Sequence, residues 1–321
     1  MELNTAIEVV GVDWGTTHRR AYALDGSGHC VAEHADGEGA LACKGRFAPS
    51  LQALLDTLRA RPRAVILSGM VGSALGWQVV PYVDASVSLA GLAGHMAALV
   101  QDAASASALS GPQQAVPVSI VPGYCVRNPA GQPDVMRGEE TQLLGASCLG
   151  HSDGWFVLPG THSKWVQLRA GQVLQLRTYM TGELFELLGR HGTLAAAAGT
   201  AAPEWDASAF AQGVQAAQGD GALSHQLFAC RARVVSGDMP ASSSRSYLSG
   251  LLIGTELRDV LHSSPGAGAA DTAAFKLIGS AALATHYQAA AALLGLKFEV
   301  LDARAAFIAA THHLFVSRKS V

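Results

Sequence analysis

Short apolar runs alternate with helical repeats of leucine and alanine along most of the chain. The run at residues 7–12 predicts a buried strand, and the Asp25-Gly26 turn signal that follows predicts a hairpin, so the chain is expected to begin with three antiparallel strands. Leucines at positions 51, 54, 55 and 58 have the spacing of one helix face. Because strands and helices alternate, we expect an α/β fold with mixed sheets and helices on their faces.

The same reasoning predicts further elements beyond residue 60. Strands are expected at 64–68, 116–121, 155–158, 164–168, 275–279 and 297–301, and helices at 139–149, 183–190, 206–217, 246–261, 281–294 and 303–315. Polar stretches rich in small residues predict loops at 102–115 and 263–270.

Two strand–turn–strand units lie 145 residues apart, counted from Gly15 to Gly160. Gly15-Thr16 matches Gly160-Thr161, and in each unit a cation follows the hydroxyl-rich turn. Repetition at nearly half the chain length predicts a duplicated, two-lobed architecture. Backbone N–H groups of a tight glycine turn approach a phosphate closely, and threonine hydroxyls add donors. Two such turns would clamp a triphosphate between the lobes.

The first of these turns also offers a metal ligand. Asp13 stands at a strand end, where its carboxylate would hold Mg²⁺ through water. The chain has neither the G-x-x-x-x-G-K-[ST] pattern nor a G-x-G-x-x-G that opens a helix. Phosphate binding is therefore expected at hairpins rather than at a strand-to-helix loop.

Composition and charge exclude several classes of protein. Apolar residues make up 49% of the 321 residues and charged residues 15%, which argues against a disordered chain and against a coiled coil. The net charge is -3 and no basic patch occurs, so no nucleic-acid partner is expected. No apolar run reaches ~18 residues and the N-terminus lacks signal-peptide features, so we expect no membrane span and a cytoplasmic protein. Five cysteines without a C-x-x-C pair fit buried free thiols in a reducing compartment.

An ordered series of motifs resembles the sugar kinase, Hsp70 and actin superfamily, and within it the 2-dehydro-3-deoxygalactonokinase family. The resemblance runs essentially end to end. It rests on Asp13-Trp14-Gly15-Thr16-Thr17 with Arg20, Gly69-Met70-Val71-Gly72-Ser73 with Gly76-Trp77 and Pro81-Tyr82, Pro122-Gly123, Met136-Arg137-Gly138-Glu139-Glu140-Thr141-Gln142, Pro159-Gly160-Thr161-His162-Ser163-Lys164-Trp165, Met180-Thr181-Gly182-Glu183-Leu184, Ser249-Gly250-Leu251-Leu252-Ile253-Gly254 and Ile278-Gly279-Ser280.

This resemblance implies a two-lobed, actin-like ATPase fold of the ribonuclease H-like kind. Mixed sheets would carry helices on both faces, and an ATP cleft would lie between the lobes. The N-terminal lobe would span residues 1–138 and hold the sugar-acid pocket, and the C-terminal lobe would span 139–321. The last helix would pack back on the N-terminal lobe.

The resemblance also implies an activity, which is ATP-dependent phosphorylation of the 6-hydroxyl of 2-dehydro-3-deoxy-D-galactonate in galactonate catabolism. ATP and Mg²⁺ would be the cofactors. Asp13 would hold Mg²⁺, and Gly279 and Ser280 would lie against the adenosine. The phosphate cradle would be lined by Gly15, Thr16, Thr17, Gly160, Thr161 and His162.

Two positions depart from the superfamily pattern. Leu158-Pro159 stands where an acid is common in the second hairpin, which leaves Asp13 as the main metal candidate. The adenosine turn reads Gly279-Ser280 rather than a double glycine.

Phosphoryl transfer needs positioning, charge neutralisation and an acceptor for the alcohol proton. Glu139 and Glu140 are the candidates for that base, Glu139 being preferred, and the alternative is helix N-terminal charge without chemistry. Lys164 follows the second hairpin and would meet the transferring phosphoryl group, unless it is a solvated strand-end lysine.

Five residues are candidates for binding the sugar acid. Arg20 and Arg137 carry guanidinium forks that bind a carboxylate or phosphate bidentately, although an ion pair would also explain them. Gly72, Ser73 and Trp77 follow a strand-end glycine turn, which suits a sugar-acid pocket as well as packing beneath a loop.

Other functions remain open at this point. The chain would equally fit a kinase of the gluconate epimer or of another sugar acid, because the epimers differ at one hydroxyl. A non-catalytic sugar- or nucleotide-sensing protein of the same fold is a second alternative, and the absence of a basic patch counts against a DNA-binding regulator. A phosphatase or an ATP-driven activator is a third, although such activators need clustered cysteines. A homodimer is expected only as the commonest assembly.

Overall fold

The computed structural model describes residues 6–100, 116–199, 202, 204–263 and 275–318. The expected loop at 102–115 and nearly all of the one at 263–270 lie outside the described residues. Strands run at β1 (Val9–Trp14), β2 (Arg19–Leu24), β3 (Cys30–Asp36), β4 (Ala64–Gly69), β5 (Ala97–Ala98), β6 (Val118–Ile120), β7 (Tyr124–Arg127), β8 (Pro133–Met136), β9 (Gly154–Leu158), β10 (Ser163–Arg169), β11 (Gln172–Tyr179), β12 (Phe275–Ile278) and β13 (Phe298–Leu301).

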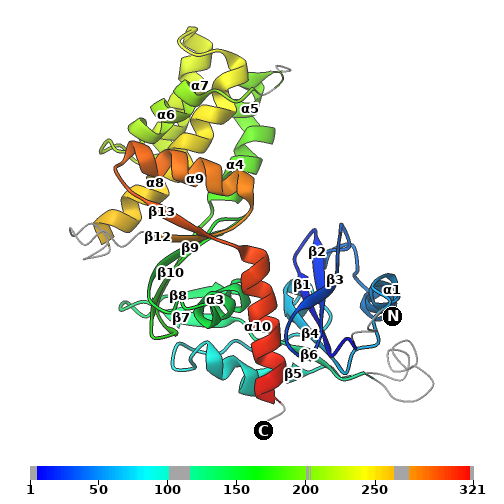
Figure 1. Cartoon of the computed structure of the whole chain (residues 1–321). Coiled ribbons are helices and arrows are strands. Elements are labelled where there is room, and N and C mark those ends of the chain that lie inside the picture. Colours follow the sequence, from blue (N-terminus) through cyan, green and yellow to red (C-terminus); the bar gives the residue numbers. More distant parts are fainter. Residues whose placement is uncertain (1–5, 101–115, 200–201, 203, 264–274, 319–321) are drawn as a thin grey trace. The chain divides into compact units, whose positions relative to one another are not determined.

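Helices make up most of the remaining regular structure (Figure 1). The α-helices are α1 (Phe47–Thr57), α3 (Glu139–Cys148), α4 (Thr181–Arg190), α5 (Gly192–Ala198), α6 (Ala207–Ala216), α7 (Leu223–Ser236), α8 (Ser244–Ser263), α9 (Ala281–Leu293) and α10 (Ala303–Arg318). Short 3₁₀ turns are η1 (Met70–Gly72), η2 (Ala90–His95) and η3 (Ala241–Ser243). Within the described part of the chain, no helix has the length and apolar character needed to cross a membrane.

The chain divides into two compact units. The first comprises Met1–Asp153, Val166–Leu176 and Asp302–Val321, and the second comprises Gly154–Trp165 and Arg177–Leu301. This division differs from the lobes expected at 1–138 and 139–321, because α3 packs on α10 and both helices stay with the first unit.

The first sheet has the strand order β3-β2-β1-β4-β6-β5. β1 is antiparallel to β2 and parallel to β4, so Asp13 lies opposite Arg20 on one neighbour and Ser68 on the other. Because parallel strands end at the same edge of a sheet, the candidate metal ligand lies at the carboxyl edge shared by β1 and β4.

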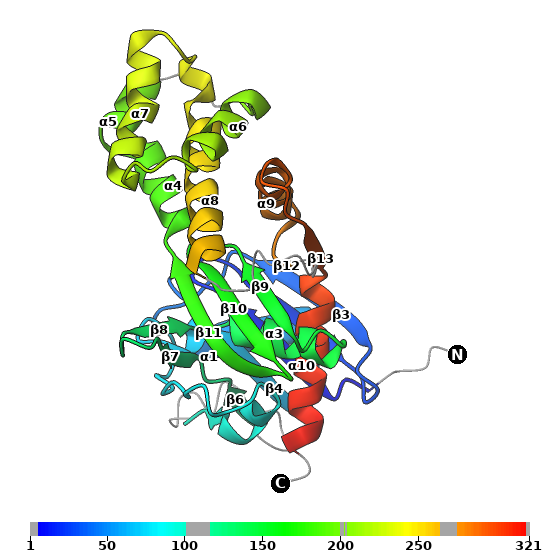
Figure 2. The same ribbon diagram turned by 90° about the vertical axis from the view of Figure 1, so that its left-hand side faces the viewer.

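The second sheet has the order β11-β10-β9-β12-β13, with β12 parallel to β9 and to β13 (Figure 2). The two sheets repeat one order of strands. β1 lies between β2 and β4, with β3 outside β2, and in the same way β9 lies between β10 and β12, with β11 outside β10. This repetition confirms the duplicated architecture that the two turns predicted.

The two turns have the same length. The first turn (residues 15–18) fills the space between β1 and β2, and the second turn (residues 159–162) fills the space between β9 and β10. Counted from the strand ends, His18 therefore corresponds to His162, and Thr17 to Thr161. Gly15 is the first residue of its turn and Gly160 is the second.

Large aromatic side chains fill the core behind each turn. Trp14 and Trp165 are fully buried and belong to the core. Trp14 packs edge-on against Phe47 at 5.5 Å between ring centroids, and Trp165 against Phe275 at 5.4 Å. Such pairs stabilise a core beyond the area that they bury.

The cysteines are free, as expected, but not all of them are buried. Cys43 and Cys230 are buried, whereas Cys148 is exposed at the C-terminal end of α3. The expectation of buried thiols was wrong for Cys148, because the last turn of that helix faces solvent.

Candidate active site

The first turn is tight and is backed by a second loop. The Gly15 N–H donates to the His18 carbonyl at 2.9 Å, which closes the turn. The Ala40 N–H donates to the Gly15 carbonyl at 2.9 Å and fastens the loop behind it. Thr16, Thr17 and His18 are exposed, so their side chains and the turn are open to a ligand.

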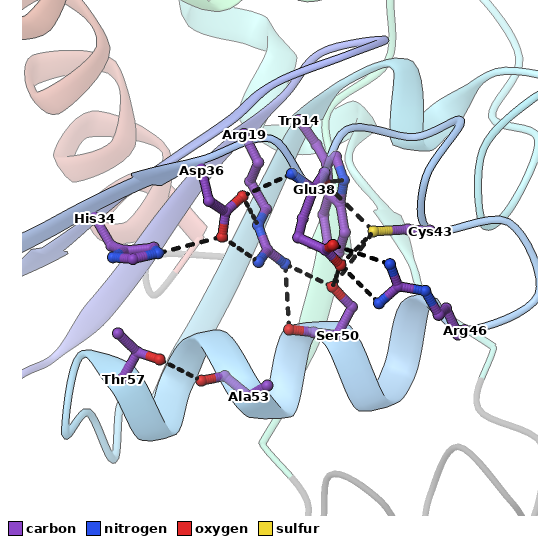
Figure 3. A network of polar contacts seen from close by, with 10 residues as sticks. All are labelled: Trp14, Arg19, His34, Asp36, Glu38, Cys43, Arg46, Ser50, Ala53 and Thr57. Carbon is purple, nitrogen blue, oxygen red and sulfur yellow. Dashed lines mark hydrogen bonds and ion pairs between the residues drawn. The ribbon is translucent and has the colours of Figure 1, made fainter.

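A buried ion pair anchors the residue that leaves this turn (Figure 3). Arg19 is only 4% exposed, and its Nη2 and Nε lie 2.7 and 3.3 Å from the two carboxylate oxygens of Asp36. Its Nη1 donates to the Ser50 Oγ at 2.9 Å. Burial is the largest single influence and opposes ionisation, but the hydrogen bond and charge of Arg19, the Glu38 N–H and the charge of His34 together hold the pKa of Asp36 below its ordinary value. The start of β2 is thereby fixed to β3 and α1.

Asp13 pairs with Arg20 at the edge of the first sheet. Its Oδ2 lies 3.6 Å from the Arg20 Nη1, and Arg20 is 56% exposed. Burial raises the pKa of Asp13 above its ordinary value, and the charge of Arg20 acts in the opposite direction. Within the described residues, no three His, Cys, Asp or Glu side chains form a ready metal site.

The two candidate bases differ in exposure. Both begin α3, and the residue before them, Gly138, lies against Gly69 at the end of β4. Glu140 is fully buried and accepts the Gly138 N–H at 2.7 Å, whereas Glu139 is half-buried and accepts the Arg137 N–H at 3.0 Å. Burial, and next the charge of Glu139, raise the pKa of Glu140 to about 8.

Arg137 has a guanidinium group with unused donors. Its Nη2 donates to the Val80 carbonyl at 2.6 Å, and the group lies over the Tyr82 ring at 4.4 Å. Its Nε and Nη1 are buried without a hydrogen-bond partner. A Cβ at position 72 would lie 2.8 Å from that Nη1, so Gly72 leaves room for the guanidinium. Buried donors of a cation rarely stay unpaired, which makes this group a candidate anion ligand.

Ser73 and Trp77 serve the local structure. The Ser73 hydroxyl donates to the Met70 carbonyl at 2.7 Å and closes the turn after β4. The Trp77 ring stacks on Phe47 at 5.9 Å and packs against the core of the first unit. These contacts match the alternative of packing beneath a loop, and a role in substrate binding stays a prediction for both residues.

A cavity of about 560 Å³ opens beside the second turn, within the second unit. Its lining includes Gly160 and Thr161 of the turn and apolar residues of α8 and α9. The turn is held from behind by α4, because the Glu183 N–H donates to the Thr161 carbonyl at 2.8 Å. A Cβ at Gly182 would lie 2.2 Å from the Gly160 carbonyl oxygen, so this approach requires glycine.

Two aromatic residues that the sequence analysis missed form part of the cavity wall. Trp205 stacks on His286 with ring centroids 4.6 Å apart. Burial lowers the pKa of His286, which favours the neutral imidazole. The two residues are far apart in sequence and neither lies in a recognisable motif, so only the fold brings them together.

The other predicted residues of the second unit lie close to this turn. His162 lies 2.6 Å from the Glu183 carboxylate. Gly279 lies against Pro159, since a Cβ there would be 3.1 Å from the proline ring. Ser280 caps α9 by accepting the Leu283 N–H, and neither Gly279 nor Ser280 lines the cavity.

Lys164 is not the solvated strand-end lysine that we considered as an alternative. It is 6% exposed, and its Nζ donates to the Thr178 Oγ1 on β11 at 2.9 Å. A role toward the phosphoryl group stays a prediction.

The chain is similar to known proteins over most of its length. The chain is 33% identical over 302 residues to the 2-dehydro-3-deoxygalactonokinase of Escherichia coli K12, covering 93% of this chain and 94% of that protein. It is 35% identical over 306 residues to a protein of Rhizobium meliloti 1021 described as a probable 2-dehydro-3-deoxygalactonokinase, covering 94% of each. A crystal structure from Sinorhizobium meliloti, provisionally named for the same kinase, superimposes with a TM-score of 0.82 at 32% identity and covers 98% of this chain and 96% of that one.

These likenesses extend over the whole of the described fold. They agree with an actin-like ATPase fold of mixed sheets and helices. The sequence profile of the family described as 2-keto-3-deoxy-galactonokinase matches residues 13–314. The chain therefore belongs to the 2-keto-3-deoxy-galactonokinase family.

Proposed function

We propose that this protein transfers the γ-phosphoryl group of ATP to the 6-hydroxyl of 2-dehydro-3-deoxy-D-galactonate. Its membership of the kinase family supports the reaction class. The observation that carries the choice of an acidic substrate is the buried guanidinium of Arg137, whose Nε and Nη1 have no partner. A sugar-acid carboxylate would satisfy them.

The first unit supplies the groups for the sugar acid. Arg137 binds the carboxylate, held in place by Tyr82 and by the Val80 carbonyl. Glu139, two residues further along the chain and half-buried, accepts the proton of the reacting hydroxyl. Arg20 lies at the same sheet edge beside Asp13, where its exposed guanidinium is available to a phosphate or carboxylate.

The second unit supplies the groups for ATP. The cavity beside the second turn holds the nucleotide, with the phosphates toward the Gly160 and Thr161 backbone. His162, paired with Glu183, lies on the same turn and is exposed. The apolar and aromatic wall, which includes Trp205 and His286, suits the base and ribose.

The residues present suit Mg²⁺ bound chiefly by the nucleotide. Mg²⁺ is usually held by one or two carboxylates together with substrate phosphates and water, rather than by a cage of protein ligands. Asp13 is the carboxylate at the sheet edge, and a cation beside it would favour its charged form against the burial that raises its pKa. When bound, the metal would neutralise charge on the phosphates.

A coupled ADP-release assay tests this proposal. The protein is mixed with Mg-ATP and 2-dehydro-3-deoxy-D-galactonate, with its gluconate epimer in a parallel reaction and no sugar as the control. ADP release that depends on the galactonate compound is the expected result. Release with the gluconate epimer alone would move the substrate to that epimer, and no sugar-dependent release would overturn the proposal.

Removing the guanidinium of Arg137 should weaken sugar-acid binding selectively. Arg137→Met keeps the length of the side chain and loses charge-assisted hydrogen bonds, so kcat/KM for the sugar acid is expected to fall about 10- to 100-fold. The KM for ATP should stay unchanged, because Arg137 belongs to the first unit and the nucleotide cavity is lined by the second. Arg127→Met, at an exposed arginine of β7, is the matched control. An unchanged KM for the sugar acid would remove Arg137 from the substrate site.

A further inference from the structure

A buried carboxylate lies behind the second turn, and no motif predicted it. Glu256 is in the middle of α8 and is 1% exposed. Its Oε1 accepts hydrogen bonds from the Ser163 Oγ at 2.7 Å and the Trp165 Nε1 at 2.5 Å. Its Oε2 accepts from the Thr181 Oγ1 at 2.5 Å and the Tyr287 hydroxyl at 2.9 Å. These four donors are neutral, so hydrogen bonds rather than an ion pair hold the carboxylate in place.

Three of the four donors come from the elements on both sides of the turn, and the fourth, Tyr287, belongs to α9. Ser163 and Trp165 belong to the start of β10, which directly follows residue 162. Thr181 begins α4, and the two residues after it contact the turn from behind. One of them, Gly182, approaches the Gly160 carbonyl, and the other donates its N–H to the Thr161 carbonyl. Glu256 thus joins the strand that leaves the turn to the helix that supports it.

In the first unit, a carboxylate also binds the residue that follows the turn. Arg19 and Ser163 are each the first residue of the strand that follows a turn, and they are 4% and 0% exposed. Arg19 is bound to Asp36, as Ser163 is to Glu256. In both units a carboxylate therefore fixes the residue at which the chain leaves the turn.

We propose that Glu256 is a positioning residue, which holds the backbone of the second turn in the conformation that binds the nucleotide phosphates. This inference rests on the proposed function for its ligand, ATP. Donors that bind a phosphate are effective when they are already oriented, so loss of the support should weaken ATP binding although Glu256 itself does not line the cavity. The sugar acid does not use this turn, and its binding should not change.

The experiment compares an apolar with a polar substitution at this position in the full-length protein. Glu256→Leu leaves all four donors without an acceptor. It is expected to raise the KM for ATP, and the Kd for a non-hydrolysable ATP analogue measured by calorimetry, at least about tenfold. The KM for the sugar acid should stay at its original value. Glu256→Gln should recover most of the affinity, because its carbonyl oxygen accepts two of the hydrogen bonds and its NH₂ group donates to the two hydroxyls.

Two further variants separate positioning from general stability. Gln226→Leu removes a buried polar group of α7 in the same unit, one that bonds to the Ala216 and Gly219 carbonyls and not to the turn. It should alter thermal stability without changing the KM for ATP. Ser163→Ala removes one donor from a residue outside the cavity lining, and it replaces Glu256→Leu if that variant does not fold. It should raise the KM for ATP by a smaller factor.

The outcomes distinguish this inference from the proposed function. Unchanged ATP affinity in a folded Glu256→Leu or Ser163→Ala variant would overturn the positioning role of Glu256. The proposed kinase reaction would not be affected by that result. Equal changes in the KM for ATP and for the sugar acid would overturn it as well, because they would indicate general damage. If the unmodified protein released no ADP with the sugar acid, the proposed reaction would fail, and calorimetry with the analogue would still decide the role of Glu256.

Discussion

Glu139→Gln is expected to lower kcat about 100- to 10,000-fold, with little change in the KM for either substrate. The side chain is half-buried at the start of α3, where it can meet a substrate hydroxyl, and its Oε2 is oriented by the Arg137 N–H at 3.0 Å. Glutamine keeps the shape and cannot accept the proton. Steady-state kinetics with saturating Mg-ATP and sugar acid measure the loss.

Glu140→Gln is the matched control, since it alters the neighbouring carboxylate, which is fully buried. We expect it to keep most of the turnover and to change the pH dependence of stability. Burial raises the pKa of Glu140 from its ordinary 4.5 to about 8, so the folded protein retains a proton that the unfolded chain has lost. Its contribution to the free energy of unfolding is therefore present below the unfolded pKa and is lost as the pH rises through the folded pKa.

Urea unfolding at about pH 6 and about pH 9 tests this contrast. The variant should lose less stability between the two values than the unmodified protein, because its amide does not ionise. Loss of turnover in Glu140→Gln together with retained turnover in Glu139→Gln would assign the base to Glu140 and contradict the proposed assignment.

The duplicated core of the fold was predictable from short, local patterns. Strands β1, β4, β9 and β12 are apolar runs that end in glycine or a turn, and such runs are recognisable without knowledge of their partners. The repeated order of the two sheets then followed from the similarity of the two turns.

Some elements were missed where the apolar pattern of the sequence does not follow the burial of the side chains. Helix α7 is the clearest case, because its buried positions include Gln226 and Cys230, while Phe228 and Val235 are exposed. Helices are recognised in a sequence by apolar residues that repeat on one face, and the apolar residues of α7 do not mark its buried face. Strand β11 has the same difficulty, since its sequence mixes Gln172, Arg177 and Thr178 with apolar residues.

The residues of the candidate site also divide into those that the sequence could identify and those that only the fold brings together. Residues within one motif, such as Arg137 and Glu139, could be named together because they are close in sequence. Glu256, Trp205 and His286 are brought to the second turn only by the packing of α8 and α9, and each is an ordinary helix or loop residue in the sequence. The unpartnered state of the Arg137 donors is also a property of the fold, because it depends on Gly72 and Tyr82.

Asp13→Asn is expected to lower kcat/KM for Mg-ATP about 1,000-fold, which corresponds to several kcal/mol of lost charge stabilisation. Asparagine keeps the shape of the side chain and removes the charge at the carboxyl edge of β1 and β4. The carboxylate of Asp13 is held 3.6 Å from Arg20, so its loss also leaves that guanidinium without its partner. Activity is measured across a Mg²⁺ titration, and a second readout is the gain in affinity for a non-hydrolysable ATP analogue that Mg²⁺ produces in calorimetry.

The control for this substitution is Asp25→Asn, which removes a carboxylate from the β2–β3 turn of the same unit. It should leave both the Mg²⁺ titration and the analogue affinity unchanged, because the carboxylate of Asp25 accepts hydrogen bonds within its own turn, from Ser27 and His29. If Asp13→Asn also kept its response to Mg²⁺, the metal would depend on other ligands and the proposed role of Asp13 would be wrong. If the response disappears in Asp13→Asn alone, a single carboxylate is sufficient on the protein side, and the phosphates of the nucleotide must complete the coordination of the metal.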